Sequence, residues 1–199
     1  MDDRVAMAIT NALLASEAGR WAEAAQFWDA FLATEDFRVW LDGGSLGFQA
    51  YPCLAAVDYQ RAGQPDKADA AFLAPKRVFG RDTYVDCYVA HGDVADLRGD
   101  WAGARDWYQK SIRLAPSLPA GYYALGVGLA RHGDLNGALT QYGLAHDRGP
   151  HWAEPLKGRA DVLAQQGRIT EALTAYDEAL QRAPHWQALI NARAALAQR

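Results

Sequence analysis

The chain has 199 residues, half of them apolar, so it is long enough and apolar enough to bury a continuous core. Its formal net charge is −4, and its Lys and Arg residues are scattered, which speaks against nucleic acid or an anionic lipid surface as a partner. No stretch approaches the roughly 18 apolar residues of a membrane span. The N-terminal residues lack the basic flank and apolar core of a secretory signal, so we expect a cytoplasmic protein unless a targeting segment has been removed.

One spaced signature recurs five times in the sequence: a glycine followed five residues later by an alanine that lies in an apolar helical pattern. The copies are Gly19 to Ala24, Gly63 to Ala68, Gly99 to Ala104, Gly133 to Ala138 and Gly167 to Ala172, and the last three are 34 residues apart. A fixed period of this length predicts stacked helical hairpins, each of which leaves an apolar face for its neighbour to cover.

The first two copies are irregular. The first covers about residues 5–38 and has Asp36 where the later copies have a proline. Residues 39–48 follow it, and their glycines predict a loop insertion. The second copy covers about residues 49–84, and Pro75 predicts an early end to its second helix.

The three later copies, at about residues 85–118, 119–152 and 153–186, are regular, because Pro116, Pro150 and Pro184 end their second helices in one register. The copy at 119–152 holds, in order, Tyr122, Leu125, Gly126, Leu129, Gly133, Ala138, Tyr142, Ala145 and Pro150. This order closely resembles the tetratricopeptide repeat (TPR) family. The resemblance covers nearly the whole chain and is most specific over the last hundred residues.

The resemblance implies an all-α fold: a right-handed superhelical solenoid of five antiparallel helix hairpins, forming a single domain over residues 1–199. The last residues, 187–199, carry Leu189, Ile190 and Leu196 on one side of a helical pattern. We expect them to form a C-terminal capping helix.

The resemblance also implies where a ligand would bind, because the first helices of successive tetratricopeptide hairpins line a concave groove. The ligand-contacting positions of the family correspond here to Asp86, Asp93, Asp96, Tyr123, Arg131, Glu154, Lys157 and Asp161. Acidic residues flank Tyr123, so we expect a protein or peptide partner that is basic or amine-bearing and has an apolar anchor. The competing interpretation is that these are ordinary solvated helix faces, with Arg131 and Lys157 paired to nearby carboxylates.

A second function is self-association or docking onto a larger assembly through the N-terminal end. This end is rich in aromatic residues, namely Trp21, Phe27, Trp28, Phe31, Phe37 and Trp40. They form either part of the core or an exposed patch.

Little in the sequence points to catalysis, a cofactor or a metal. His91 is the one acid-base candidate, and a packed histidine is the simpler interpretation. The His-Trp pairs at 151–152 and 185–186 recur at the repeat period, which indicates turn packing rather than a metal site. Cys53 and Cys87 are too few for a disulfide framework and are interpreted as small buried apolar side chains in a reducing compartment. We therefore expect a non-catalytic interaction scaffold.

Overall fold

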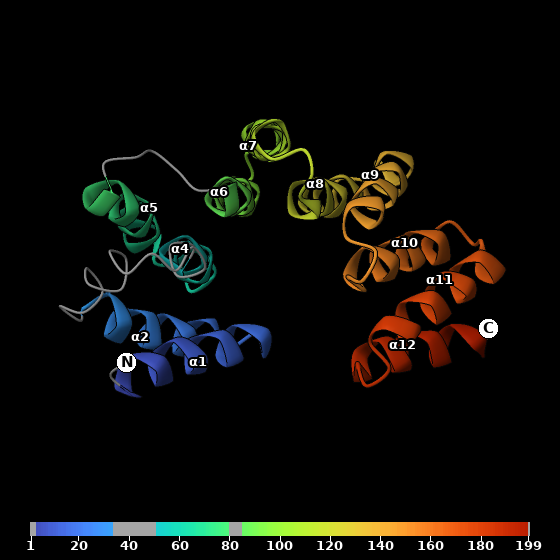
Figure 1. Ribbon diagram of the computed structural model, residues 1–199, viewed down its shortest axis with the longest axis horizontal. Helices are drawn as coiled ribbons and strands as arrows, with labels where there is room; N and C mark the ends of the chain where they lie inside the picture. Colours follow the sequence, from blue (N-terminus) through green and yellow to red (C-terminus); the bar gives the residue numbers. More distant parts are fainter. Residues whose placement is uncertain (1–2, 34–50, 80–84, 199) are drawn as a thin grey trace. The chain divides into compact units, whose positions relative to one another are not determined.

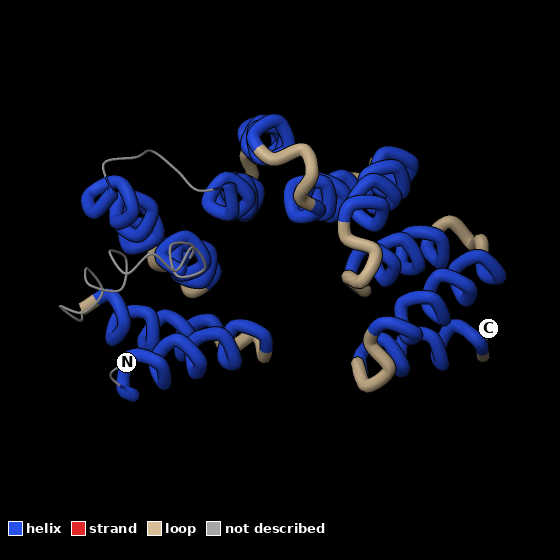
Figure 2. The backbone as a smooth tube through the Cα atoms, viewed as in Figure 1, coloured by secondary structure: helices blue, strands red, loops and turns tan. Residues whose placement is uncertain are grey.

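The computed structural model describes residues 3–33, 51–79 and 85–198, and every element in these ranges is an α-helix (Figures 1 and 2). The chain divides into two compact units, residues 1–107 and 108–199, which are treated separately below. The first unit contains α1 (Asp3–Glu17), α2 (Trp21–Leu32), α4 (Tyr51–Arg61), α5 (Pro65–Phe79) and α6 (Val85–Leu97). Helix α7 (Trp101–Leu114) begins in the first unit and ends in the second. The second unit continues with α8 (Pro119–Arg131), α9 (Leu135–Arg148), α10 (Glu154–Gln165), α11 (Ile169–Arg182) and α12 (Gln187–Ala197).

The five signature glycines each end the first helix of a hairpin. All five have positive φ, between 71° and 87°, which is the left-handed conformation that glycine adopts without steric cost. At Gly133, the glycine N–H donates to the carbonyl of Ala130, and the next residue, Asp134, donates to that of Leu129. The same pair of hydrogen bonds recurs at the other four glycines, so the expected all-α repeat fold is confirmed.

The five signature alanines lie where the two helices of a hairpin cross. Each of them is 0% exposed: Ala24, Ala68, Ala104, Ala138 and Ala172. A methyl group is the largest side chain that such a close crossing admits without displacement of the partner helix. The spacing from glycine to alanine therefore encodes a turn followed by a tight contact.

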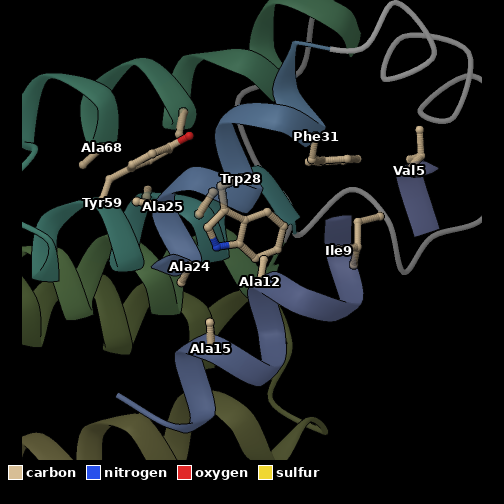
Figure 3. Packing of buried hydrophobic residues seen from close by; sticks show 13 residues of the cluster. Val5, Ile9, Ala12, Ala15, Ala24, Ala25, Trp28, Phe31, Tyr59 and Ala68 are labelled. Atoms are coloured by element: carbon tan, nitrogen blue, oxygen red, sulfur yellow. The ribbon is translucent and has the colours of Figure 1, made fainter. Parts of the chain in front are cut away.

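The core of the first unit is built around the indole of Trp28, which is fully buried (Figure 3). The rings of Phe31 and Tyr51 pack against it with centroids 6.0 and 6.1 Å away. Core packing is thus the confirmed interpretation for Trp28 and Phe31, and Phe27 packs partly buried against the same cluster. Phe37 and Trp40 lie outside the described residues, as does the predicted insertion at 39–48.

A buried carboxylate joins three helices of the first unit. Asp58 on α4 is only 3% exposed. Its Oδ2 accepts a hydrogen bond from Nε1 of Trp28 on α2 at 2.8 Å, and its Oδ1 accepts one from Oγ of Ser16 on α1 at 2.9 Å. Burial raises the pKa of Asp58, and the bonds from Trp28 and Ser16 and the charge of Arg61 offset part of this rise.

In the second unit, two arginines hold successive repeats together. Nε of Arg148 at the end of α9 donates to the carbonyl of Pro116, and Nε of Arg182 at the end of α11 donates to that of Pro150, both at 2.6 Å. The guanidinium of Arg148 also lies 4.1 Å from the centroid of the Tyr122 ring. These bonds place the proline turns in the common register that the sequence indicates.

Helix α12 packs its apolar side against α10 and α11 of the same unit. Leu189 and Leu196 are buried in the cluster that α10 and α11 also line, and Arg193 at the edge donates to Asp177 of α11 at 2.8 Å. The repeat boundaries and the single domain remain predictions.

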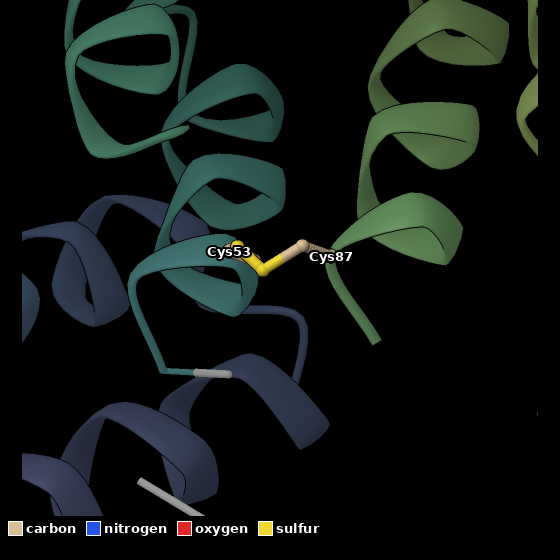
Figure 4. Close-up of a disulfide and its surroundings, with 2 residues drawn as sticks. All are labelled: Cys53 and Cys87. Atoms are coloured by element: carbon tan, nitrogen blue, oxygen red, sulfur yellow. A yellow bond between two sulfur atoms is a disulfide. The ribbon is translucent and has the colours of Figure 1, made fainter. Parts of the chain in front are cut away.

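Two sequence-based interpretations are wrong. Helix α5 does not stop at Pro75 but continues to Phe79. A proline removes one backbone hydrogen bond, and here it does so only about one turn before the end of the helix. Cys53 and Cys87 are buried as expected, but they are joined in a disulfide rather than being separate apolar side chains (Figure 4).

Within the described residues, no helix is long and apolar enough to cross a membrane.

Candidate functional site

Three of the predicted site residues belong to α6 in the first unit. Asp86 lies in the first turn of that helix, and its side chain is outside the described part of the structure. Asp93 is half-buried, and Asp96 is 8% exposed. Asp96 therefore offers a ligand little carboxylate surface.

The other five predicted residues belong to α8 and α10 in the second unit, and three of them lie near Tyr142 of α9. Burial raises the pKa of Tyr142, the neighbouring Tyr123 and Asp161 raise it further, and Arg131 lowers it. Tyr123, Arg131 and Asp161 are therefore all within electrostatic range of one phenol. Two neighbouring first helices supply these side chains, and a second helix supplies the ring between them.

Asp161 is the centre of a small polar network on α10. Its Oδ2 lies 2.7 Å from Nζ of Lys157, one turn earlier, and its Oδ1 accepts a hydrogen bond from the hydroxyl of Tyr176 on α11. Burial and the bond to Asp161 raise the pKa of Tyr176. The predicted pairing of Lys157 with a carboxylate is thus confirmed.

Tyr123 lies in an apolar strip along α8. Its ring centroid is 4.7 Å from that of Trp152 and 5.9 Å from that of Tyr142. Val127 and Ala130, four and seven residues further on, are partly buried against the same cluster. We refer to Tyr123, Val127, Arg131, Lys157 and Asp161 together as the α8–α10 face. Glu154 is the first residue of α10, two turns before Asp161, and so lies about 10 Å further along the helix.

Two glycines make room for Tyr142 beneath this face. A Cβ atom on Gly126 of α8 would lie 2.9 Å from Cδ1 of the Tyr142 ring, and one on Gly158 of α10 would lie 2.6 Å from its Cζ. Any larger residue at either position has to displace the ring. The absence of side chains at Gly126 and Gly158 therefore sets the position of Tyr142 between α8 and α10.

The second unit also contains the segment that matches a family model. Residues 153–186, which form α10 and α11, match the model of the tetratricopeptide repeat. No curated protein sequence matches the chain significantly.

Solved structures of tetratricopeptide-repeat proteins align with the chain over nearly its whole length. TTC0263, a protein of the thermophile Thermus thermophilus, is 16% identical with a TM-score of 0.71, over 98% of this chain and 100% of its own. YrrB, described as having an unusual peptide-binding site, is 20% identical with a TM-score of 0.55, over 94% and 90%. A protein from Parabacteroides merdae is 14% identical with a TM-score of 0.57, over 98% and 72%.

Residues 153–186 therefore match one tetratricopeptide repeat, and the chain as a whole has the fold of the solved tetratricopeptide-repeat proteins. Sequence reasoning located four members of the α8–α10 face but missed Tyr142 and Gly158, which support it. A signal was present, because Gly158 is a glycine inside a helix that otherwise follows the repeat pattern, and such a residue indicates close approach of another group.

The first unit contains a shallow groove of about 400 Å³ that sequence reasoning also missed. The imidazole of His91 lies there, stacked between two aromatic rings. Its centroid is 3.8 Å from that of the Phe72 ring and 4.6 Å from that of the Trp107 ring. Arg98 lines the same groove, and its guanidinium is already bound by Asp69 at 2.9 Å and Gln60 at 2.8 Å. His91 is therefore a packed histidine. Among the described residues, no group of three or more His, Cys, Asp or Glu side chains is placed to hold a metal ion.

Proposed function

We propose that the chain is a non-catalytic scaffold that binds a peptide or protein segment on the α8–α10 face. The observation that carries this proposal is that the Tyr123 ring lies 5.9 Å, centroid to centroid, from the buried ring of Tyr142, with Arg131 and Asp161 in electrostatic range of the same phenol. Such a face combines an aromatic surface with fixed polar groups on rigid helices, which is the combination that peptide-binding surfaces use. The similarity of the fold to YrrB, described as having a peptide-binding site, is in keeping with this proposal.

Affinity would come mainly from apolar contact with α8. Tyr123 is partly buried and is held by Trp152, so little side-chain entropy is lost when a ligand covers its exposed part. Val127 lies one turn further along and extends the apolar surface. A peptide with an aromatic or branched apolar anchor fits this strip.

Charge would orient the peptide rather than supply most of the affinity. Among the predicted site residues of α8 and α10, the positive charges of Arg131 and Lys157 offset the negative charges of Glu154 and Asp161. A basic peptide residue gains from the carboxylates only where it does not meet Arg131 or Lys157. We therefore expect peptide affinity to depend weakly on salt concentration.

Replacement of Tyr123 with alanine tests this proposal. For a peptide selected from a displayed library against the full chain, we expect Tyr123→Ala to weaken binding at least about tenfold, as loss of an aromatic anchor does. The exposed Thr140 on α9 provides the control, and Thr140→Ala should leave the dissociation constant unchanged. Isothermal titration calorimetry gives both values, and equal affinities for the wild type and Tyr123→Ala would refute the proposal.

A second candidate function, self-association through the N-terminal end, is favoured by one observation. Met7 and Leu14 of α1 are seven residues apart, hence on one side of the helix, and they are 61% and 54% exposed. An exposed apolar pair of this kind fits a contact with another copy of the chain. Light scattering decides this point, because a strict monomer at high concentration removes this candidate.

A further inference from the structure

The disulfide lies at equivalent positions of two neighbouring first helices. Cys53 is the third residue of α4, and Cys87 is the third residue of α6. The two Cα atoms are 5.2 Å apart although 34 residues separate them in the sequence (Figure 4). The bond thus joins the first helix of one hairpin to the first helix of the next.

The buried side chains between these helices are small. Among the described residues the buried cluster there consists of the two cysteines with Val57, Ala90 and Val94, and Phe72 packs partly buried against it. By contrast, the cluster formed by α10, α11 and α12 includes four buried leucines and a buried tyrosine, namely Leu156, Leu163, Leu189, Leu196 and Tyr176. Since the apolar area that a side chain buries grows with its size, these small side chains bury little area each, and the disulfide lies among them.

We propose that the Cys53–Cys87 disulfide is a structural cross-link between the first helices of two successive hairpins, and that the chain folds and works in an oxidising compartment. A cross-link across a loop of this length restricts the unfolded chain and so favours the folded state. Disulfides persist in oxidising compartments and are kept reduced in the cytosol. An oxidising compartment thus replaces the cytoplasm expected from the sequence, where both cysteines were interpreted as thiols.

Burial indicates that the bond is structural rather than a rapid thiol switch. Cys53 is 2% exposed and Cys87 is 1% exposed, so a reducing agent reaches neither sulfur in the folded state. Reduction requires that a thiolate of a dithiol attack one sulfur while the other cysteine leaves as a thiolate and takes up a proton. The second thiol of the reagent then releases the first cysteine and closes a cyclic disulfide. The first attack has to wait for α4 and α6 to separate.

Alkylation of thiols, followed by mass spectrometry, tests the bond directly. In full-length protein purified from an oxidising compartment, we expect no alkylated cysteine in the native state or in denaturant alone, and two after reduction in denaturant. We also expect native-state reduction by dithiothreitol to reach a limiting rate as the dithiol concentration rises. Two alkylated cysteines in unreduced protein, or a reduction rate that rises without limit, would overturn the proposal.

Thermal unfolding tests the stabilising role. We expect the midpoint of the first unit to fall by at least about 5 °C when oxidised wild type is compared with the Cys53→Ala/Cys87→Ala double variant. Because that variant removes two buried sulfurs as well as the bond, reduced wild type is the second comparison and should show a similar fall. Equal midpoints for oxidised and reduced wild type would contradict a structural role.

Discussion

Replacement of Asp58 with alanine is expected to lower the free energy of unfolding of the first unit by about 3 kcal/mol. The substitution leaves the Trp28 indole N–H and the Ser16 hydroxyl without their shared acceptor, and an unpaired buried donor costs about 1–3 kcal/mol. It also leaves space beside a fully buried tryptophan. Urea unfolding, followed by tryptophan fluorescence, measures the change.

The matched control is Asp58→Asn, which preserves the shape of the side chain. Its amide oxygen can accept from Trp28 while its NH₂ group donates to the Ser16 hydroxyl, so we expect a loss of less than about 1 kcal/mol at neutral pH. If alanine is tolerated as well as asparagine, the hydrogen bonds of Asp58 do not stabilise the unit.

The stabilities of wild type and of Asp58→Asn should also depend differently on pH. Because the pKa of Asp58 is raised in the folded state, the protonated carboxyl adds to the stability of the fold. This contribution is fully present below the ordinary pKa of an aspartic acid and is lost as the pH rises through the raised value. Wild type should therefore lose stability relative to Asp58→Asn over this window. A difference that does not change with pH would contradict the assignment of a raised pKa.

Replacement of Gly158 with alanine is expected to destabilise the second unit by about 2 kcal/mol. Alanine is the better helix former by about 1 kcal/mol, but its Cβ atom would lie 2.6 Å from Cζ of the buried Tyr142 ring, and overpacking of this kind costs about 1–3 kcal/mol or more. The ring has little freedom to retreat, because Gly126 contacts it from the other first helix. The change also displaces the Tyr142 ring beneath the α8–α10 face, so both peptide affinity and stability should fall.

Gly143 on α9 provides the control for this substitution. It is also a helical glycine, and a Cβ atom added there would meet no atom within 4 Å. Gly143→Ala should therefore stabilise the unit by up to about 1 kcal/mol through helix propensity alone. Chemical denaturation of the two variants should give shifts of opposite sign. A stabilising Gly158→Ala would show that Tyr142 does not occupy the position described here.

The repeat fold could be predicted from the sequence because its determinants are local. The spacing from Gly133 to Ala138 encodes a left-handed turn and a close helix crossing within six residues, and the same spacing recurs along the chain. The positions of Tyr123 and Asp161 on first helices follow from the same register. The register does not show which of these side chains form hydrogen bonds within the protein. Asp161, for example, accepts one from the hydroxyl of Tyr176.

The features that sequence reasoning missed depend on contacts between distant residues. Asp58 is buried and accepts a hydrogen bond from Trp28, thirty residues earlier, and nothing adjacent to Asp58 in the sequence indicates this. The pairing of Cys53 with Cys87, in contrast, could have been predicted from the sequence. Their separation of 34 residues equals the repeat period, and equivalent residues of parallel first helices lie side by side in stacked hairpins. Counting the cysteines without considering the register led to the wrong interpretation.

The most direct test of the proposed peptide-binding site is to map the backbone amides that respond to ligand. A library-selected peptide is added to isotope-labelled protein, and amide chemical shifts are followed by NMR. We expect the largest changes at residues of the α8–α10 face, with smaller changes on the outer sides of α9 and α11. If the largest changes lie on α9 and α11, or only in the first unit, the α8–α10 face is not the binding site.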